Sequence, residues 1–309
     1  MPIVLQESLR AVFYAPFYAA FALRAYEAEG VDVRFQPKPL PSDAATALLD
    51  GAADVVWGGP MRVIATRERV PGCDLVCFCE VVTRDPFIVV GRDPRPEFRL
   101  ADLDDVSLAT VSEVPTPWMC LQEDLRRDGI DPARLRRIGD RGMAENAAAL
   151  RRGDVDAIQV FEPFIETLLA ERAAHIWYAA ATRGPASYTT FYAARPLLET
   201  RRAELRRMVR AVYRVQKWVA AAEPETMAEV VASFFPELEP PHLVGALARY
   251  KRLGIWGRNP RLPRGGYQRL AAGLVSGGLV RAAASYEEAV DNSLAEEVIA
   301  DDPPPIRVG

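Results

Sequence analysis

Runs of hydrophobic residues alternate with helix-forming segments from residue 2 to residue 180. Uninterrupted hydrophobic runs between helices are typical of parallel strands that are covered on both faces. The pattern predicts strands at residues 2–8, 31–35, 55–57, 74–82, 87–90, 106–111, 134–138, 157–161 and 176–180. It predicts helices between them at residues 16–29, 42–50, 60–69, 118–128, 144–152 and 163–172. Repeated strand–helix units of this kind predict an α/β fold with parallel sheets.

The last third of the chain has a different pattern. Residues 188–194 read as one more strand, and helices are predicted after it at residues 197–222, 224–235, 241–253, 265–276 and 293–300. The tail at 302–309 contains three consecutive prolines, and we expect it to be loose. If the strand at 188–194 returns to the first sheet, the first lobe is discontinuous. We therefore predict two α/β lobes with a ligand cleft between them. One lobe comprises residues 1–84 and 188–309, the other comprises residues 85–187, and the hinge lies near 83–85 and 187–190.

Two segments of similar design are expected to face each other across this cleft, Ala53–Pro60 and Gly153–Pro163. In each, a helix ends in Gly, an Asp-containing turn follows, and a buried strand leads to a helix that begins near Pro. Ligands of open parallel sheets bind beyond the carboxyl ends of strands. The alternative, that both segments are ordinary strand-to-helix turns, stays open at this point.

Composition narrows the class of protein. The chain has 309 residues with a formal net charge of −4, so nothing favours nucleic acid as a partner. No apolar run is long enough to span a bilayer, and we expect no membrane insertion. The chain enters a strand directly after Met1. We therefore expect a cytoplasmic protein if Met1 is the native start, or a periplasmic one if an export signal was removed.

Few residues suggest covalent or metal chemistry. The two histidines, His175 and His242, lie outside any motif, and the four cysteines lack zinc-ligand spacing and are expected to be buried free thiols. No phosphate-binding loop or dinucleotide glycine pattern is present. We therefore predict no catalytic residues, metal or cofactor.

Aromatic and small polar residues near predicted strand ends are the candidates for ligand binding. The predicted ligand-binding residues are Ser8, Tyr14, Trp57, Gly58, Gly59, Ser112, Thr116, Trp118, Glu162, Tyr188 and Thr189. Aromatic rings would stack on a planar ligand. Amide groups at the starts of the helices near residues 60 and 117 would favour an anion, whereas Glu162 would favour a cationic or amide-bearing group such as an aminopyrimidine. Both alternatives stay open, and the hypothesis places Trp57 and Glu162 on opposite walls.

Several motifs resemble those of a known family. They are Phe13–Ala20 followed by Tyr26–Val33, Leu150–Ala157 with Glu162-Pro163, Asn259–Arg261, and Tyr286–Asp291. In order and spacing they resemble the solute-binding proteins of the nitrate/sulfonate/taurine transporters and the related thiamine-pyrimidine synthases. The resemblance covers most of the chain and implies the type II periplasmic-binding-protein fold, in which two lobes close on a small ligand.

One departure from the pyrimidine synthases matters. Those proteins carry a lysine that holds pyridoxal phosphate and, four residues later, a histidine that is consumed. After the third predicted strand this chain has Gly58-Gly59-Pro60-Met61-Arg62 instead, so the resemblance implies neither the cofactor nor the histidine donor.

Together these observations favour reversible binding over catalysis. The expected ligand is a small polar metabolite, aromatic or heteroaromatic, of the thiamine-pyrimidine precursor, sulfonate or aromatic carboxylate type. The protein would serve an ABC transporter permease, or act as a cytosolic homologue. The alternative is an enzyme on the same scaffold, such as a decarboxylase, a desulfinase or a pyrimidine-forming protein.

Overall fold

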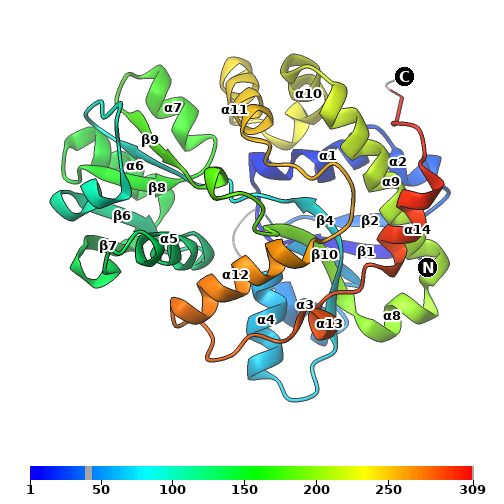
Figure 1. The fold of residues 1–309 in the computed structure, drawn as a ribbon. Coiled ribbons are helices and arrows are strands. Elements are labelled where there is room, and N and C mark those ends of the chain that lie inside the picture. Colours follow the sequence, from blue (N-terminus) through cyan, green and yellow to red (C-terminus); the bar gives the residue numbers. More distant parts are fainter. Residues whose placement is uncertain (39–43, 308–309) are drawn as a thin grey trace.

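A computed structural model describes residues 1–38 and 44–307, and it contains two five-stranded sheets (Figure 1). The first sheet has the order β2-β1-β3-β10-β4. Its strands are β1 (Ile3–Glu7), β2 (Val33–Gln36), β3 (Val55–Gly58), β4 (Leu75–Val82) and β10 (Thr189–Ala194). The second sheet has the order β7-β6-β8-β5-β9. Its strands are β5 (Ile88–Gly91), β6 (Ser107–Val111), β7 (Arg136–Arg141), β8 (Ala157–Val160) and β9 (His175–Ala179). Two α/β lobes result, as the sequence pattern predicts.

Each sheet contains one antiparallel strand beside parallel ones. β10 is antiparallel to β3 and to β4, with Phe191 opposite Trp57 and Cys79. β5 is antiparallel to β8 and to β9. The remaining pairs, β1 with β2 and β3, and β6 with β7 and β8, are parallel. The carboxyl ends of β1, β3, β6 and β8 are therefore the edges at which an α/β fold places a ligand.

Helices cover both sheets. Those that follow strands of the first sheet are α1 (Ala15–Ala22), α2 (Ala25–Ala28), α3 (Ala44–Leu49) and α4 (Pro60–Arg69). Those within the second lobe are α5 (Thr116–Arg127), α6 (Met143–Arg152) and α7 (Phe164–Ala170). The last third adds α8 (Arg195–Thr200), α9 (Arg202–Ala221), α10 (Pro224–Val231), α11 (Pro240–Leu253), α12 (Arg264–Ser276), α13 (Tyr286–Ala289) and α14 (Ser293–Asp301). Short 3-10 turns are η1 (Val12–Tyr14), η2 (Leu100–Asp105), η3 (Pro132–Arg134), η4 (Ala180–Arg183) and η5 (Ala232–Phe234). Proline begins several of the helices, including α4 at Pro60, because its missing N–H has no partner to lose there.

Two helices of the last third reach across to the second lobe. α11 packs against α7, and α12 packs against both α4 and α5 (Figure 1). A Cβ atom on Gly273 of α12 would lie 3.5 Å from Cys120 Cα of α5, so the two helices approach closely.

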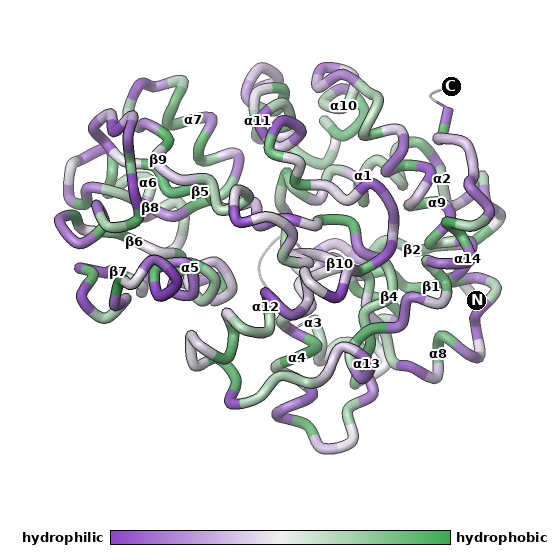
Figure 2. The backbone as a smooth tube through the Cα atoms, viewed as in Figure 1, coloured by the Kyte–Doolittle hydropathy of each residue, from purple (hydrophilic) through white to green (hydrophobic). Residues whose placement is uncertain are grey.

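The core explains why these runs form strands. All eight residues of β4 are buried, although β4 lies at the edge of its sheet. Isolated bridges from Val290 and Trp256 cover that edge, which protects it from pairing with another chain. The hydropathy view shows hydrophobic residues along β4 and hydrophilic residues on the outer turns of the helices (Figure 2). No helix within the described residues is long and apolar enough to cross a membrane.

The structure corrects three details of the predicted elements and does not test a fourth. The helix expected at 16–29 is divided, because Arg24 has a left-handed backbone with φ 52°, which a helix interior does not allow. The helix expected at 197–222 is divided at Arg201. The strand expected at 134–138 is β7, at 136–141, because η3 takes up residues 132–134. The expected helix start at Ser42 lies outside the described residues.

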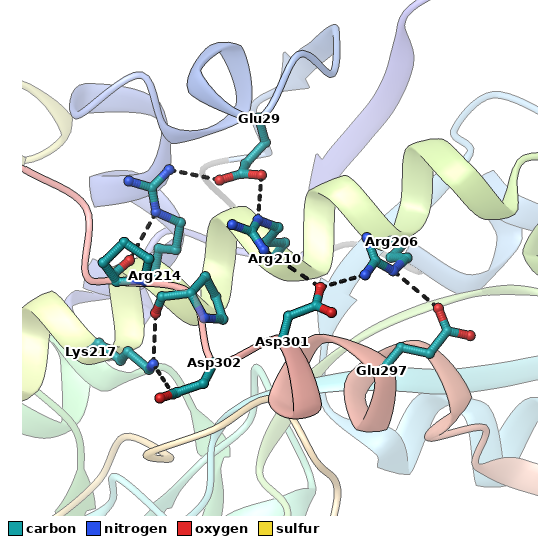
Figure 3. Close-up of polar contacts among 10 residues, drawn as sticks. Glu29, Arg206, Arg210, Arg214, Lys217, Glu297, Asp301 and Asp302 are labelled. Carbon is teal, nitrogen blue, oxygen red and sulfur yellow. Dashed lines mark hydrogen bonds and ion pairs between the residues drawn. The ribbon is translucent and has the colours of Figure 1, made fainter.

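The expectation of a loose tail is wrong as far as Arg307, because the charged face of α9 holds it (Figure 3). Arg214 Nε donates to the Pro304 carbonyl at 3.0 Å, and Ile306 N donates to the Arg214 carbonyl at 3.2 Å. Figure 3 also shows Glu29 between two arginines of α9. Its carboxylate accepts from Arg210 Nε at 2.8 Å and from Arg214 Nη1 at 2.7 Å. Glu29 thereby joins the N-terminal part of the chain to α9, the helix that also binds the C-terminal tail.

We predict that Glu29→Gln lowers the free energy of unfolding by about 1.5 kcal/mol, because it leaves two arginines with a neutral partner. Urea unfolding measures this change. The matched control is Glu27→Gln, whose one ion pair among the described residues, with Arg24, is 3.9 Å long and exposed. The control should change stability by less than about 0.5 kcal/mol. Equal effects of both variants would contradict the assignment.

Candidate functional site

A small cavity lies where the carboxyl ends of strands from the two sheets meet. Its volume is about 30 Å³. The first sheet contributes residues that follow β1 and β3, and the second sheet contributes residues that follow β6 and β8. The lining residues are Ser8, Leu9, Phe13, Tyr14, Gly59, Met61, Arg62, Phe87, Val114, Thr116, Phe161 and Tyr188. Gly59 and Phe161 belong to the two segments that the sequence predicts on opposite sides of the cleft. We call this space the interlobe cavity.

Hydroxyl groups gather at the first-lobe side of the interlobe cavity. Ser8 Oγ and Tyr14 Oη are 3.1 Å apart. Burial raises the pKa of Tyr14, while the hydroxyl of Ser8 and the charge of Arg62 oppose that rise, so the phenol stays protonated and can donate. A Cβ atom on Gly58 would lie 3.3 Å from Ser8 Oγ and 3.2 Å from Tyr192 Oη, so the backbone of β3 passes close behind this group. These hydroxyls can bind an oxygen-rich ligand.

Arg62 brings a positive charge to the same side. It lies in the first turn of α4, two residues after Pro60, and its side chain is half-buried. Within residues 1–38 and 44–307, no carboxylate forms an ion pair with Arg62. The other described residues of the lining include no Asp or Glu. The cavity therefore offers one cation without an anionic partner among the described residues.

Aromatic rings form the opposite wall and part of the floor. Phe13 meets Phe161 edge to face, with ring centroids 5.2 Å apart, and Phe161 meets Phe87 in the same way at 5.1 Å. Phe13 follows β1, whereas Phe87 and Phe161 adjoin strands of the second sheet, so this contact crosses between the lobes. These rings give this side of the cavity an apolar surface.

Trp57 and Trp118 are core residues, which corrects their predicted place at the cleft. Trp57 is fully buried and stacks between Phe17, at 4.7 Å and 6°, and Phe35, at 5.5 Å and 11°. Side chains alternate along a strand, and the Trp57 side chain lies on the face of β3 that α1 covers. Trp118 packs into the hydrophobic core of the second lobe, with the guanidinium of Arg137 4.5 Å from its ring centroid.

Glu162 is also placed differently from the prediction. It is fully buried, but its carboxylate turns away from the lining residues. One oxygen accepts from Glu166 N at 2.9 Å, and the other lies 3.3 Å from Arg249 Nε of α11. Burial raises the pKa of Glu162 to about 7, and the charge of Arg249 opposes this. Glu162 therefore joins α7 to α11 and does not line the cavity wall.

The structure brings together five of the predicted residues and separates the rest. Ser8, Tyr14, Gly59, Thr116 and Tyr188 line the interlobe cavity. Gly58 and Thr189 lie behind the lining, and Ser112 is exposed at the end of β6. Sequence reasoning missed Arg62. The available signal was the position of Arg62 in the first turn of a helix that follows a buried strand.

The described lining of the cavity offers hydroxyl groups but few other reactive side chains. Its lining contains no Cys, His, Lys, Asp or Glu. Cys77 and Cys79 lie buried in β4, and burial raises the pKa of each thiol far above its usual range. In the described part of the chain, no three His, Cys, Asp or Glu side chains are grouped to hold a metal.

Known proteins share this sequence pattern and architecture. A family model described as NMT1/THI5 like matches residues 13–227. YtlA of Bacillus subtilis (strain 168) is named as a binding protein, a name given provisionally. It is 22% identical to this chain over 294 residues, which cover 94% of this chain and 88% of YtlA.

Two solved structures show how widely the fold is used. The periplasmic aliphatic sulphonate binding protein SsuA from Escherichia coli is 16% identical, with a TM-score of 0.76 over 100% of this chain and 94% of SsuA. The desulfurization enzyme DSZB is 14% identical, with a TM-score of 0.71 over 97% of this chain and 100% of DSZB. The fold is thus that of type II periplasmic binding proteins. Because a binding protein and an enzyme share it, function has to be argued from the cavity.

We predict that Trp57→Ala lowers the free energy of unfolding by about 3–5 kcal/mol, because it empties a stacked position in the core. The matched variant Trp57→Phe keeps a ring between Phe17 and Phe35 and should lose clearly less. Urea unfolding of both variants measures the difference. A near-neutral Trp57→Ala would show that the ring is not part of the core.

Proposed function

The chain belongs to the NMT1/THI5-like family, and from that premise we propose that it reversibly binds a small organic anion between its two lobes. The ligand class is an aryl or alkyl sulfonate or carboxylate. As the solute-binding protein of a transporter, it would deliver this ligand to an ABC transporter permease.

The observation that carries this proposal is the charge of the interlobe cavity. Arg62 is a cation without an ion-pair partner among residues 1–38 and 44–307, and the hydroxyls of Ser8, Tyr14 and Thr116 line the same space. A guanidinium presents planar paired donors that match a carboxylate or sulfonate, and hydroxyls can donate to further oxygens. A cationic ligand would meet Arg62 and no described carboxylate.

This charge distribution supports an anion over the other ligand class that the sequence left open. An aminopyrimidine would need a carboxylate, and Glu162 was the candidate. Glu162 instead accepts a hydrogen bond from Glu166 N and pairs with Arg249. It is therefore not available to bind a cationic heterocycle in the cavity. Phe13, Phe87 and Phe161 supply an apolar wall for the hydrocarbon part of an anion.

Binding also requires the lobes to move. A space of about 30 Å³ holds little more than one water molecule. We propose that residues 1–84 with 188–309 and residues 85–187 move as two bodies about hinges at 83–85 and 187–190. The division is supported by the two sheets, whose strands fall on either side of these bounds. Hinge closure around a ligand is a common motion of such two-lobed proteins.

The enzyme alternative receives less support from the cavity. Covalent catalysis needs an activated nucleophile beside a base, and the described lining offers hydroxyls without a His, Lys or carboxylate next to them. We therefore keep binding as the function and use turnover as a test of it.

We predict that the protein binds benzenesulfonate or benzoate in isothermal titration calorimetry and that Arg62→Gln weakens this binding at least tenfold. A charged hydrogen bond is worth about 1.5–3 kcal/mol, and about 1.4 kcal/mol is tenfold. The matched control is Arg67→Gln, which removes the same charge from the same helix. Arg67 bonds to the Leu75 carbonyl and does not line the cavity, so affinity should stay within twofold.

Two results would contradict this proposal. One is tighter binding of an aminopyrimidine than of any organic anion, with Arg62→Gln improving it. The other is consumption of the ligand, followed by proton NMR of the mixture, which would move the chain to the enzyme class.

A further inference from the structure

A second and larger cavity lies at the crossings between the lobes, which we call the hinge cavity. Its volume is about 620 Å³, within the range of small-molecule sites, and it shares no lining residue with the interlobe cavity. The crossing segments contribute Thr83, Arg84 and Pro185. The rest of the lining comes from β4, α9, the end of α11 and the loop that joins α11 to α12.

Two buried side chains of the hinge cavity each have an acceptor oxygen without a hydrogen bond among the described residues. Glu80 of β4 is 2% exposed and Gln216 of α9 is 1% exposed, and both line the hinge cavity. Gln216 Nε2 donates to the Glu80 carbonyl at 2.9 Å and to the Asn259 carbonyl at 3.3 Å, which fixes the amide. Within the described residues, Gln216 Oε1 and Glu80 Oε2 then have no hydrogen-bond partner. Unpartnered buried acceptors are costly, so a donor from outside the chain would be favoured here.

Cations line the same cavity. Arg84, Lys251 and Arg258 each lack a carboxylate partner among residues 1–38 and 44–307. Arg84 donates to the Leu253 carbonyl at 3.3 Å, Lys251 donates to the Ala222 carbonyl, and Arg258 is exposed. A fourth cation, Arg261, lies 3.7 Å from Glu296. The cavity thus combines buried acceptors with cations that have no counter-charge.

We propose that the hinge cavity binds a free amino acid, with its ammonium group at Glu80 and Gln216 and its carboxylate at Arg84, Lys251 and Arg258. An ammonium group carries three N–H donors, and these suit the two acceptor oxygens that have no hydrogen bond within the described residues. A carboxylate suits the guanidinium and ammonium groups of the lining. A ligand with only one of these charges would leave the other half of the cavity unmatched.

A hydrogen bond of Trp256 connects this site with the interlobe cavity. Trp256 lines the hinge cavity, and its Nε1 donates to the Phe13 carbonyl at 2.8 Å. Phe13 in turn lines the interlobe cavity. The two sites are neighbours that share no lining residue, so a substitution in one can be chosen to leave the other intact.

The protonation of Glu80 makes the proposal testable by pH. Burial raises the pKa of Glu80 to about 8, and the nearby hydroxyls of Ser187 and Thr83 oppose this in part. The other titratable groups around it are the thiols of Cys77 and Cys79, which burial keeps neutral, and the lining cations. Below pH 8 an ammonium group must displace the proton of Glu80. The ionised fraction rises about tenfold per pH unit there, so affinity should strengthen about tenfold from pH 6 to pH 7 and level off above pH 8.

Isothermal titration of the full chain with L-alanine, L-glutamate and L-lysine at pH 6, 7 and 8 tests this, with benzenesulfonate present to occupy the interlobe cavity. At least one amino acid should bind, with the stated pH dependence. Glu80→Gln should weaken binding at least tenfold and abolish the pH dependence. Arg258→Gln should also weaken it at least fivefold, whereas the control Arg252→Gln, an exposed cation outside the lining, should not.

Three outcomes would overturn the proposal. The first is no binding of any of these amino acids at pH 8. The second is binding that survives Glu80→Gln unchanged or, should that variant fail to fold, survives Arg258→Gln unchanged. The third is equal binding of methylamine or acetate, which would reveal a site for a single charge. If benzenesulfonate does not bind, these three outcomes can still be judged, because amino-acid binding depends on residues of the hinge cavity and sulfonate binding on residues of the interlobe cavity.

Discussion

β10 forms hydrogen bonds with β3 on one side and β4 on the other, antiparallel to both. This pairing requires the chain to leave the first sheet after β4, build the second sheet, and return. Two crossings follow, and they place Thr83 and Ala186 side by side, since Ala186 N donates to the Thr83 carbonyl at 2.7 Å. The return also sets Tyr188 at the end of β3, where a Cβ atom on Gly59 would lie 3.3 Å from the Tyr188 carbonyl. Both cavities depend on this arrangement, since Thr83 and Pro185 line the hinge cavity and Tyr188 lines the interlobe cavity.

Much of this architecture could be predicted from local patterns. Hydrophobic runs, prolines at helix starts and glycines at helix ends are local signals, and Gly51 and Gly153 end helices in the left-handed conformation, as expected. The meeting of Gly59 with Phe161 also followed, because carboxyl ends of parallel strands gather at one edge of a sheet. The antiparallel placement of β5 between β8 and β9 has no such local signal.

The errors at the site have non-local causes. Trp57 is held by Phe17 and Phe35, from separate segments, and a strand end alone does not show which face a helix will cover. Glu162 is held by Arg249, 87 residues later in the chain, so its partner could not be inferred from its own motif. Arg62 is different. It lies inside Gly58–Arg62, the segment that lacks the lysine and histidine of the pyrimidine synthases, and its position in the first turn of a helix is a local signal.

The two lobes are held against each other by two unlike contacts. On one side Arg249 of α11 pairs with Glu162 and Glu166 of the second lobe, and on the other α12 packs closely on α5 through Gly273. Apolar packing is favourable in itself, whereas a buried ion pair roughly offsets its own desolvation. The ion pairs of Arg249 therefore fix the orientation of the two lobes more than they stabilise their contact. A ligand that neutralises Arg62 and fills the space between Phe13 and Phe161 would add stabilisation only where both lobes contact it. Such differential contact is what lets a ligand select the closed state.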